Sequence, residues 1–144
     1  MRIQIPEFNK SVLSKILNIS EAATIAIHSM ALIARSKDLL NAHEIAELTG
    51  FSKNHISKVL QQLVKNNLLN STRGPKGGFE IRKDPQSISL MEIYKVIDGE
   101  IDTGTGCKMH CENCPFNNCI FGGLSAKFSR EFSNYLKEKT LATV

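Results

Sequence analysis

The sequence has no apolar run of about 18–20 residues, the length that a membrane-spanning helix needs. Its most apolar stretch, residues 22–34, is interrupted by Thr24, His28 and Ser29. The N-terminus also lacks a secretory signal, because polar and charged residues surround Pro6 and no small-residue cleavage site follows an apolar stretch. We therefore expect a cytoplasmic protein without membrane contact, whose cysteine thiols stay reduced.

Internal repeats and low-complexity tracts are missing from the sequence as well. Of the 144 residues, 42% are hydrophobic and 22% are charged, which excludes the disordered, collagenous and coiled-coil classes. The length predicts one domain. A chain of this size can bury enough surface for a core without covalent staples.

Positive charge is concentrated in one part of the chain. Between positions 52 and 83, seven residues are basic and one is acidic, although the net charge of the whole chain is only +4. A basic region on a nearly neutral remainder is typical of a surface that binds a polyanion. A solvated surface with chance clustering is the alternative interpretation.

Three residues at relative positions 0, +4 and +10 predict a helix-turn-helix. Ala46 allows close helix packing, Gly50 suits a left-handed turn, and Ile56 would pack the second helix against the first. Capping residues mark where the helices begin. The expected N-caps are Ser20, Asn41, Ser52 and Ser89, and Glu44 and Glu92 would complete capping boxes with Asn41 and Ser89.

The second helix of this motif is polar at its exposed positions, and a basic hairpin follows it. Short strands at 68–69 and 79–81 flank the turn Arg73-Gly-Pro-Lys-Gly-Gly78, which is typical of a wing. Such side chains can contact base edges and phosphates in the major groove, and the wing arginine can enter a narrow minor groove. A protein-binding winged helix is the alternative. The candidate DNA-binding residues are Ser52, Lys53, Asn54, His55, Ser57, Lys58, Arg73 and Lys76.

All four cysteines lie within thirteen residues, spaced Cys107-x3-Cys111-x2-Cys114-x4-Cys119. Disulfides would close only short loops and would be reduced in the cytoplasm, so a metal site is the better interpretation. Zinc accepts four thiolates but usually binds two cysteine pairs separated by a longer spacer. The spacing therefore favours an iron–sulfur cluster over zinc or redox-active thiols. His110 in the same segment is more typical of a solvated side chain than of a ligand.

Together these features resemble the IscR/NsrR/RirA/CymR family of bacterial winged-helix transcription regulators. The matching motifs are Asn54-His-Ile-Ser-Lys58, the wing turn, and the outer cysteines Cys107 and Cys119. The resemblance implies a homodimer, paired through its C-terminal helices, that presents two recognition helices to two-fold-related half-sites of double-stranded DNA. It also implies that the cluster is a sensor, so that the protein is not an enzyme.

The resemblance also suggests a ligand set. The outer cysteines match the family's first and third ligand cysteines, while Cys111 and Cys114 flank the position of its middle cysteine. Gly122 stands where one family member has a histidine ligand, which favours an all-cysteine four-iron cluster over a two-iron cluster. Some members take an acidic ligand from the partner subunit near the start of the first core helix. Glu21 occupies that position as a further candidate ligand, although a helix-capping role is the preferred explanation of this residue.

These interpretations give a mainly α fold with a small β wing. The expected parts are a helical N-terminal extension (1–19), a winged helix-turn-helix domain (20–98), a cysteine segment (99–123), and a dimerisation helix with its tail (124–144). The predicted function is transcriptional regulation in which an iron–sulfur cluster controls operator binding in response to iron, redox state or nitric oxide. A cluster-free or zinc-bearing repressor that senses a small molecule or a partner protein is the alternative.

Overall fold

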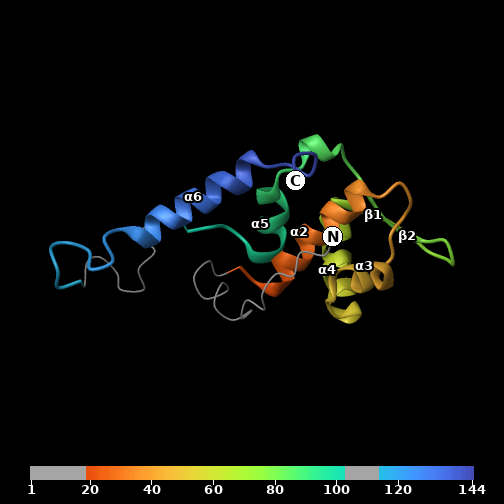
Figure 1. Ribbon diagram of the computed structural model, residues 1–144, viewed down its shortest axis with the longest axis horizontal. Coiled ribbons are helices and arrows are strands. Elements are labelled where there is room, and N and C mark those ends of the chain that lie inside the picture. The colour runs from red at the N-terminus through yellow and green to blue at the C-terminus, as the bar shows by residue number, and fades with distance from the viewer. Residues whose placement is uncertain (1–18, 103–113) are drawn as a thin grey trace, which may run out of the picture.

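The computed structural model describes residues 19–102 and 114–144, and within these ranges the chain is mostly helical (Figure 1). This architecture confirms the predicted mainly α fold with a small β wing. The expected N-terminal extension lies outside the described residues except for Ile19. In chain order the elements are α2 (Glu21–Arg35), α3 (Ala42–Thr49), α4 (Lys53–Lys65), β1 (Leu69–Thr72), β2 (Gly78–Ile81), the 3-10 helix η1 (Pro85–Ser87), α5 (Leu90–Asp98) and α6 (Leu124–Glu138).

The helices α2, α3, α4 and α5 begin directly after the predicted capping residues. Asn41 forms a complete capping box, because its Oδ1 accepts the Glu44 N–H at 2.9 Å while Glu44 Oε2 accepts the Asn41 N–H at 2.8 Å. The second expected box is formed only in part. Ser89 Oγ accepts the Glu92 N–H at 3.1 Å, but the carboxylate of Glu92 pairs instead with the ammonium group of Lys83 at 2.9 Å.

The helix-turn-helix is closed by Gly50, the C-cap of α3. Its backbone has φ 77° and ψ 3°, which is the left-handed conformation that glycine adopts without steric cost. The Gly50 N–H donates to the carbonyl of Ala46 at 2.8 Å, so the last turn of α3 is satisfied. The side chain of Ile56 is fully buried where α4 packs against α3, as the spacing predicted.

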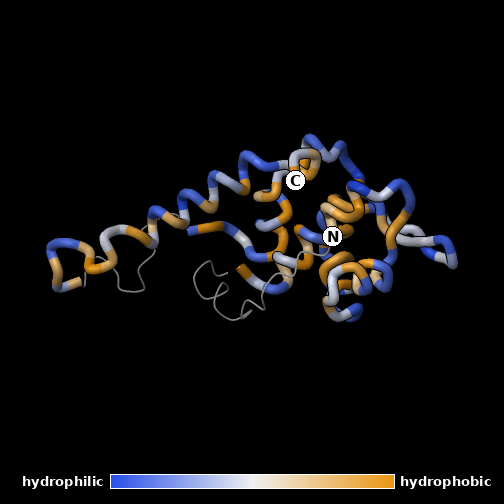
Figure 2. The backbone as a smooth tube through the Cα atoms, viewed as in Figure 1, coloured by the Kyte–Doolittle hydropathy of each residue, from blue (hydrophilic) through white to orange (hydrophobic). Residues whose placement is uncertain are grey.

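The core forms where α2 packs against α4 and α5 (Figure 2). Small residues on α2, such as Ala23 and Ala26, are fully buried and allow close approach of the neighbouring helices. The largest fully buried apolar side chains in the described residues are Ile25, Met30, Ile45, Ile56, Leu60, Leu63, Leu68, Leu69, Ile88 and Ile93.

The wing is an antiparallel pair in which Leu69 lies opposite Ile81 and Thr72 lies opposite Gly78. Both strands are longer than the predicted segments. The Phe79 N–H donates to the Leu40 carbonyl at 2.8 Å and the Leu40 N–H donates to the Phe79 carbonyl at 3.4 Å. These bonds attach the wing to the connection between α2 and α3.

Among residues 19–102 and 114–144, helix α6 contacts the rest of the domain through its C-terminal half. Leu136 is buried, and the ring of Phe132 meets that of Tyr94 on α5 edge-to-face at a centroid distance of 5.6 Å. Beyond α6, the Leu90 N–H donates to the Lys139 carbonyl at 2.9 Å, and the Leu141 N–H donates to the Ile88 carbonyl at 3.0 Å. The N-terminal half projects away from the domain (Figure 1).

None of the helices in the described ranges combines the length and apolar character needed to cross a bilayer.

Candidate DNA-binding face and cysteine site

The recognition helix α4 presents a polar surface opposite a buried aliphatic one. Ile56, Val59, Leu60 and Leu63 are buried, which fixes the orientation of the helix on the core. On the remaining surface, the predicted DNA-binding residues Ser52, Lys53, Asn54 and Lys58 are exposed, and His55 and Ser57 are half-buried. The first turn of α4 contains no acidic residue.

The wing tip carries the other two predicted DNA-binding residues, Arg73 and Lys76, and both are exposed. A hollow of about 310 Å³ lies between the wing and α4 and is lined by Arg73 of the wing, by Gln61 of α4 and by Asn41, the N-cap of α3. Nothing in the sequence indicated that Gln61 lies beside the wing, because the helical pattern does not show where the wing folds back.

Two of the seven basic residues between positions 52 and 83 have side-chain partners in the folded domain. The guanidinium group of Arg82 donates to Asn67 Oδ1 at 2.7 Å, and Lys83 pairs with Glu92. The other basic residues are exposed and have no ion-pair partner among residues 19–102 and 114–144. They are Lys53, Lys58, Lys65, Arg73 and Lys76. The charge available to a polyanion is therefore smaller than the sequence count, but it is concentrated on α4 and the wing.

The structure brings together two candidate residues that the sequence treated separately. The carboxylate of Glu21, at the start of α2, lies 3.8 Å from Nδ1 of His55 on α4. Both side chains are partly open to solvent, so this pair adds little to stability by itself. It places the candidate ligand Glu21 in contact with the recognition helix.

Only part of the predicted cysteine site lies within the described residues. Cys107, Cys111 and His110 lie outside them, whereas Cys114 is half-buried, Cys119 is exposed, and both are free thiols. No group of three metal-ligating side chains gathers in the two described ranges, which contain two of the four cysteines.

Cys119 lies in a tight turn immediately before α6. Gly122 and Gly123 have left-handed backbones, with φ values of 60° and 71°, and the Gly122 N–H donates to the Cys119 carbonyl at 2.9 Å. Backbone N–H groups of Gly123, Phe121 and Gly122 near the sulfur lower the pKa of the thiol. A thiolate stabilised in this way is suited to metal ligation.

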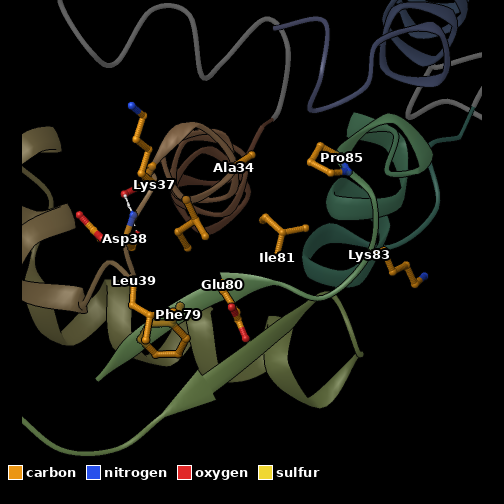
Figure 3. A pocket seen from close by; sticks show the side chains of 11 residues that line it. Ala34, Lys37, Asp38, Leu39, Phe79, Glu80, Ile81, Lys83 and Pro85 are labelled. Carbon is orange, nitrogen blue, oxygen red and sulfur yellow. Dashed lines mark hydrogen bonds between the residues drawn. The ribbon is translucent and has the colours of Figure 1, made fainter. Parts of the chain in front are cut away.

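A second hollow, of about 470 Å³, lies between the end of α2 and strand β2 (Figure 3). Ala34, Ile81 and Pro85 line it with apolar groups, while Lys83 points away toward its partner Glu92. No sequence motif indicated this hollow, and none of the candidate DNA-binding or cysteine residues lines it.

Comparison with known proteins identifies relatives of this chain. The family described as "Rrf2: Iron-dependent Transcriptional regulator" matches residues 19–144. The HTH-type transcriptional regulator NsrR of Bacillus licheniformis is 30% identical over 104 residues, which cover 70% of this chain and 69% of NsrR. The HTH-type transcriptional regulator IscR of Klebsiella pneumoniae is 31% identical over 100 residues, which cover 68% of this chain but only 60% of IscR.

Solved structures support the same fold. The cysteine regulator CymR of B. subtilis superimposes with a TM-score of 0.70 at 20% identity, covering 87% of this chain and 93% of CymR. IscR of T. potens gives a TM-score of 0.65 at 21% identity and covers 87% of this chain and 83% of that protein. At these identities the likeness concerns the fold alone.

Proposed function

The chain belongs to the Rrf2 family of transcriptional regulators, and from that membership we propose that an iron–sulfur cluster bound by residues 107–119 controls its affinity for operator DNA. The membership confirms the family predicted from the sequence. It also agrees with the prediction of a regulator rather than an enzyme, because the relatives are named transcriptional regulators.

The DNA-binding part of the proposal rests on α4 and the wing. Exposed Lys53 and Lys58 can contact phosphates, while Asn54 can read base edges in the major groove. Arg73 at the wing tip would enter the adjacent minor groove. Such a regulator would act in the cytoplasm, where its operator lies.

The proposed assembly is a homodimer formed through α6. Leu124 and Phe128 in its projecting half are 50% and 46% exposed, and Tyr135 is 53% exposed. A second copy of the helix would cover this apolar surface and would place two α4 helices on two-fold-related half-sites. Phe132 and Leu136 on the same helix already pack on their own domain.

The observation that carries the cluster proposal is the run of four closely spaced cysteines, of which Cys114 and Cys119 are free thiols in the structure; backbone N–H groups lower the pKa of Cys119. Cys107, Cys111, Cys114 and Cys119 would hold the cluster, of the four-iron type. When bound, it would make the order of this segment dependent on iron or redox state. The backbone donors around Cys119 would offset part of the charge of its thiolate.

The test is metal analysis of protein purified without oxygen. We expect about four iron and four sulfide per chain, with visible absorption that air or nitric oxide removes. DNA selected from a random pool should then bind with different affinity to the loaded and cluster-free forms. Stoichiometric zinc, or the absence of both metals after reconstitution with iron and sulfide, would overturn the proposal in favour of a zinc-bearing or cluster-free repressor.

Single substitutions identify the ligands. In the all-cysteine scheme, Cys→Ser at 107, 111, 114 or 119 removes iron and absorbance, while the neighbouring variant Asn118→Ser retains both. If the variant lacking Cys111 or the one lacking Cys114 keeps a full cluster, the four-cysteine scheme is wrong. Loss of the cluster in Glu21→Ala would instead indicate three cysteines with a carboxylate ligand from the partner subunit.

A further inference from the structure

The last turn of α5 is hydrogen-bonded to two other helices. Asp98, the final residue of α5, accepts the N–H of Ser20 on Oδ2 at 3.1 Å and the hydroxyl of Ser20 on Oδ1. Two residues earlier, the carbonyl of Val96 accepts a hydrogen bond from Nε2 of Gln62 at 2.9 Å. The first pair of residues is separated by 78 positions in the sequence and the second pair by 34, so these bonds exist only in the folded domain.

Each bond reaches an element that sets the position of the recognition helix. Ser20 is the N-cap of α2, and its Oγ also accepts the Ala23 N–H at 3.0 Å. Asp98 thus fixes the group from which α2 starts, and the next residue, Glu21, contacts His55 on α4. Gln62 lies on α4 itself. The last turn of α5 is therefore linked to the recognition helix indirectly near its start, through Ser20 and the adjacent Glu21, and directly near its end, through Gln62.

The same turn is also the point where the chain leaves the domain for the cysteine segment. Gly99 ends α5 with φ 81°, and residues 99–123 follow. One turn back, Tyr94 packs on Phe132 of α6, the helix at the other end of that segment. The charge of Asp98 acts on this tyrosine too, because burial and then Asp98 raise the pKa of Tyr94.

We propose that Asp98 and Gln62 are positioning residues, which transmit the state of the cysteine segment to the recognition helix by holding α2 and α4 against the last turn of α5. This inference rests on the proposed function, since it names the path by which the segment changes DNA affinity. A displacement of the α5 end would move the start of α2 and the C-terminal part of α4 together. Neither residue ligates the cluster or contacts DNA in this scheme.

The test compares how strongly cluster loading changes DNA affinity in matched variants. Asp98→Asn keeps the shape of the side chain but leaves one oxygen to accept two hydrogens, and Gln62→Met removes the donor while keeping the length. Asp38→Asn is the control for the lost charge and Gln86→Met the control for the lost amide, because both side chains are exposed on other elements. Coupling between sites is commonly about 5–150-fold. We expect Asp98→Asn and Gln62→Met to keep their full iron content. Their ratio of DNA affinity in the loaded form to that in the cluster-free form should be roughly 2–30-fold closer to one than the wild-type ratio.

A second measurement separates transmission from a general loss of stability. Amide hydrogen exchange at Ala23 and Thr24 in the first turn of α2, and along α4, should respond to cluster loading in the wild type and in both controls. It should not respond in Asp98→Asn. If Asp98→Asn and Gln62→Met keep the wild-type affinity ratio and exchange response, the inference is wrong. If the wild type shows no cluster-dependent change at all, the proposed function fails first.

Discussion

Replacing Gly50 with alanine isolates the energetic cost of the helix-turn-helix turn. The residue has φ 77° and ψ 3°, and a Cβ atom placed there would meet nothing within 4 Å. Because the space is open, the substitution creates no clash, and the Gly50 N–H bond to Ala46 can remain. The whole effect is then the cost of holding an L-residue in the left-handed conformation, which is about 1–2 kcal/mol.

The matched variant is Gly50→Asn. Asparagine visits the left-handed region more readily than alanine, so its cost should be well under that of alanine. Urea denaturation of the cluster-free protein measures both, with an unchanged m-value as the sign that the folded and unfolded states are comparable. A domain is typically stable by about 5–15 kcal/mol, so both variants should remain folded.

DNA binding provides the second readout. If both variants keep the native turn, the crossing angle of α3 and α4 is preserved and affinity for selected DNA stays near that of the wild type. A stability loss in Gly50→Asn equal to that in Gly50→Ala would refute the reasoning, as would full stability of Gly50→Ala. Either result would mean that the turn adopts another conformation when a side chain is present.

Four further outcomes follow from the site and the wing. Lys58→Ala should weaken binding to all DNA sequences alike and reduce the salt slope by about one, whereas Asn54→Ala should cost about 1–3 kcal/mol on the preferred sequence alone, as measured by titration at several salt concentrations. Gly78→Ala would place a Cβ 2.8 Å from two backbone atoms of the α2–α3 connection, so that wing amides exchange faster while helical circular dichroism is retained. Because the backbone donors lower the pKa of the Cys119 thiol, its thiolate persists to lower pH, and iodoacetamide should alkylate it at a lower pH in the folded cluster-free protein than after urea unfolding. Phe128→Glu should convert the proposed dimer to a monomer in light scattering, and an unchanged mass would exclude the α6 interface.

Local signals in the sequence were sufficient for most of the DNA-binding domain. The N-caps and the turn glycine each depend on residues three or four positions apart, which a reading of the chain can compare directly. The same holds for the exposed and buried faces of α4. These features follow from helical geometry and backbone sterics, so tertiary packing does not change them.

Contacts between distant segments were not predictable in this way. Glu92 has the spacing of a capping box, yet its carboxylate pairs with the ammonium group of Lys83, which lies nine positions earlier in the chain. The pairing of Ser20 with Asp98 joins residues that no periodic pattern relates. The cysteine spacing indicated a metal site, but the backbone donors at Cys119 come from the turn geometry that only the structure describes.

The attachment of α6 through residues that follow it bears on the order in which the protein is made. Domains generally fold from the N-terminus as the chain leaves the ribosome. The winged helix can therefore assemble before Lys139 and Leu141, which bond to Leu90 and Ile88, have emerged. Until then, the far end of the cysteine segment lies beyond a helix roughly 22 Å long that Phe132 and Leu136 hold to the domain without the backbone bonds of Lys139 and Leu141. The segment should consequently gain its final position only when residue 141 has been made, and a variant that ends at residue 138 should retain DNA binding but hold iron less firmly than the full chain.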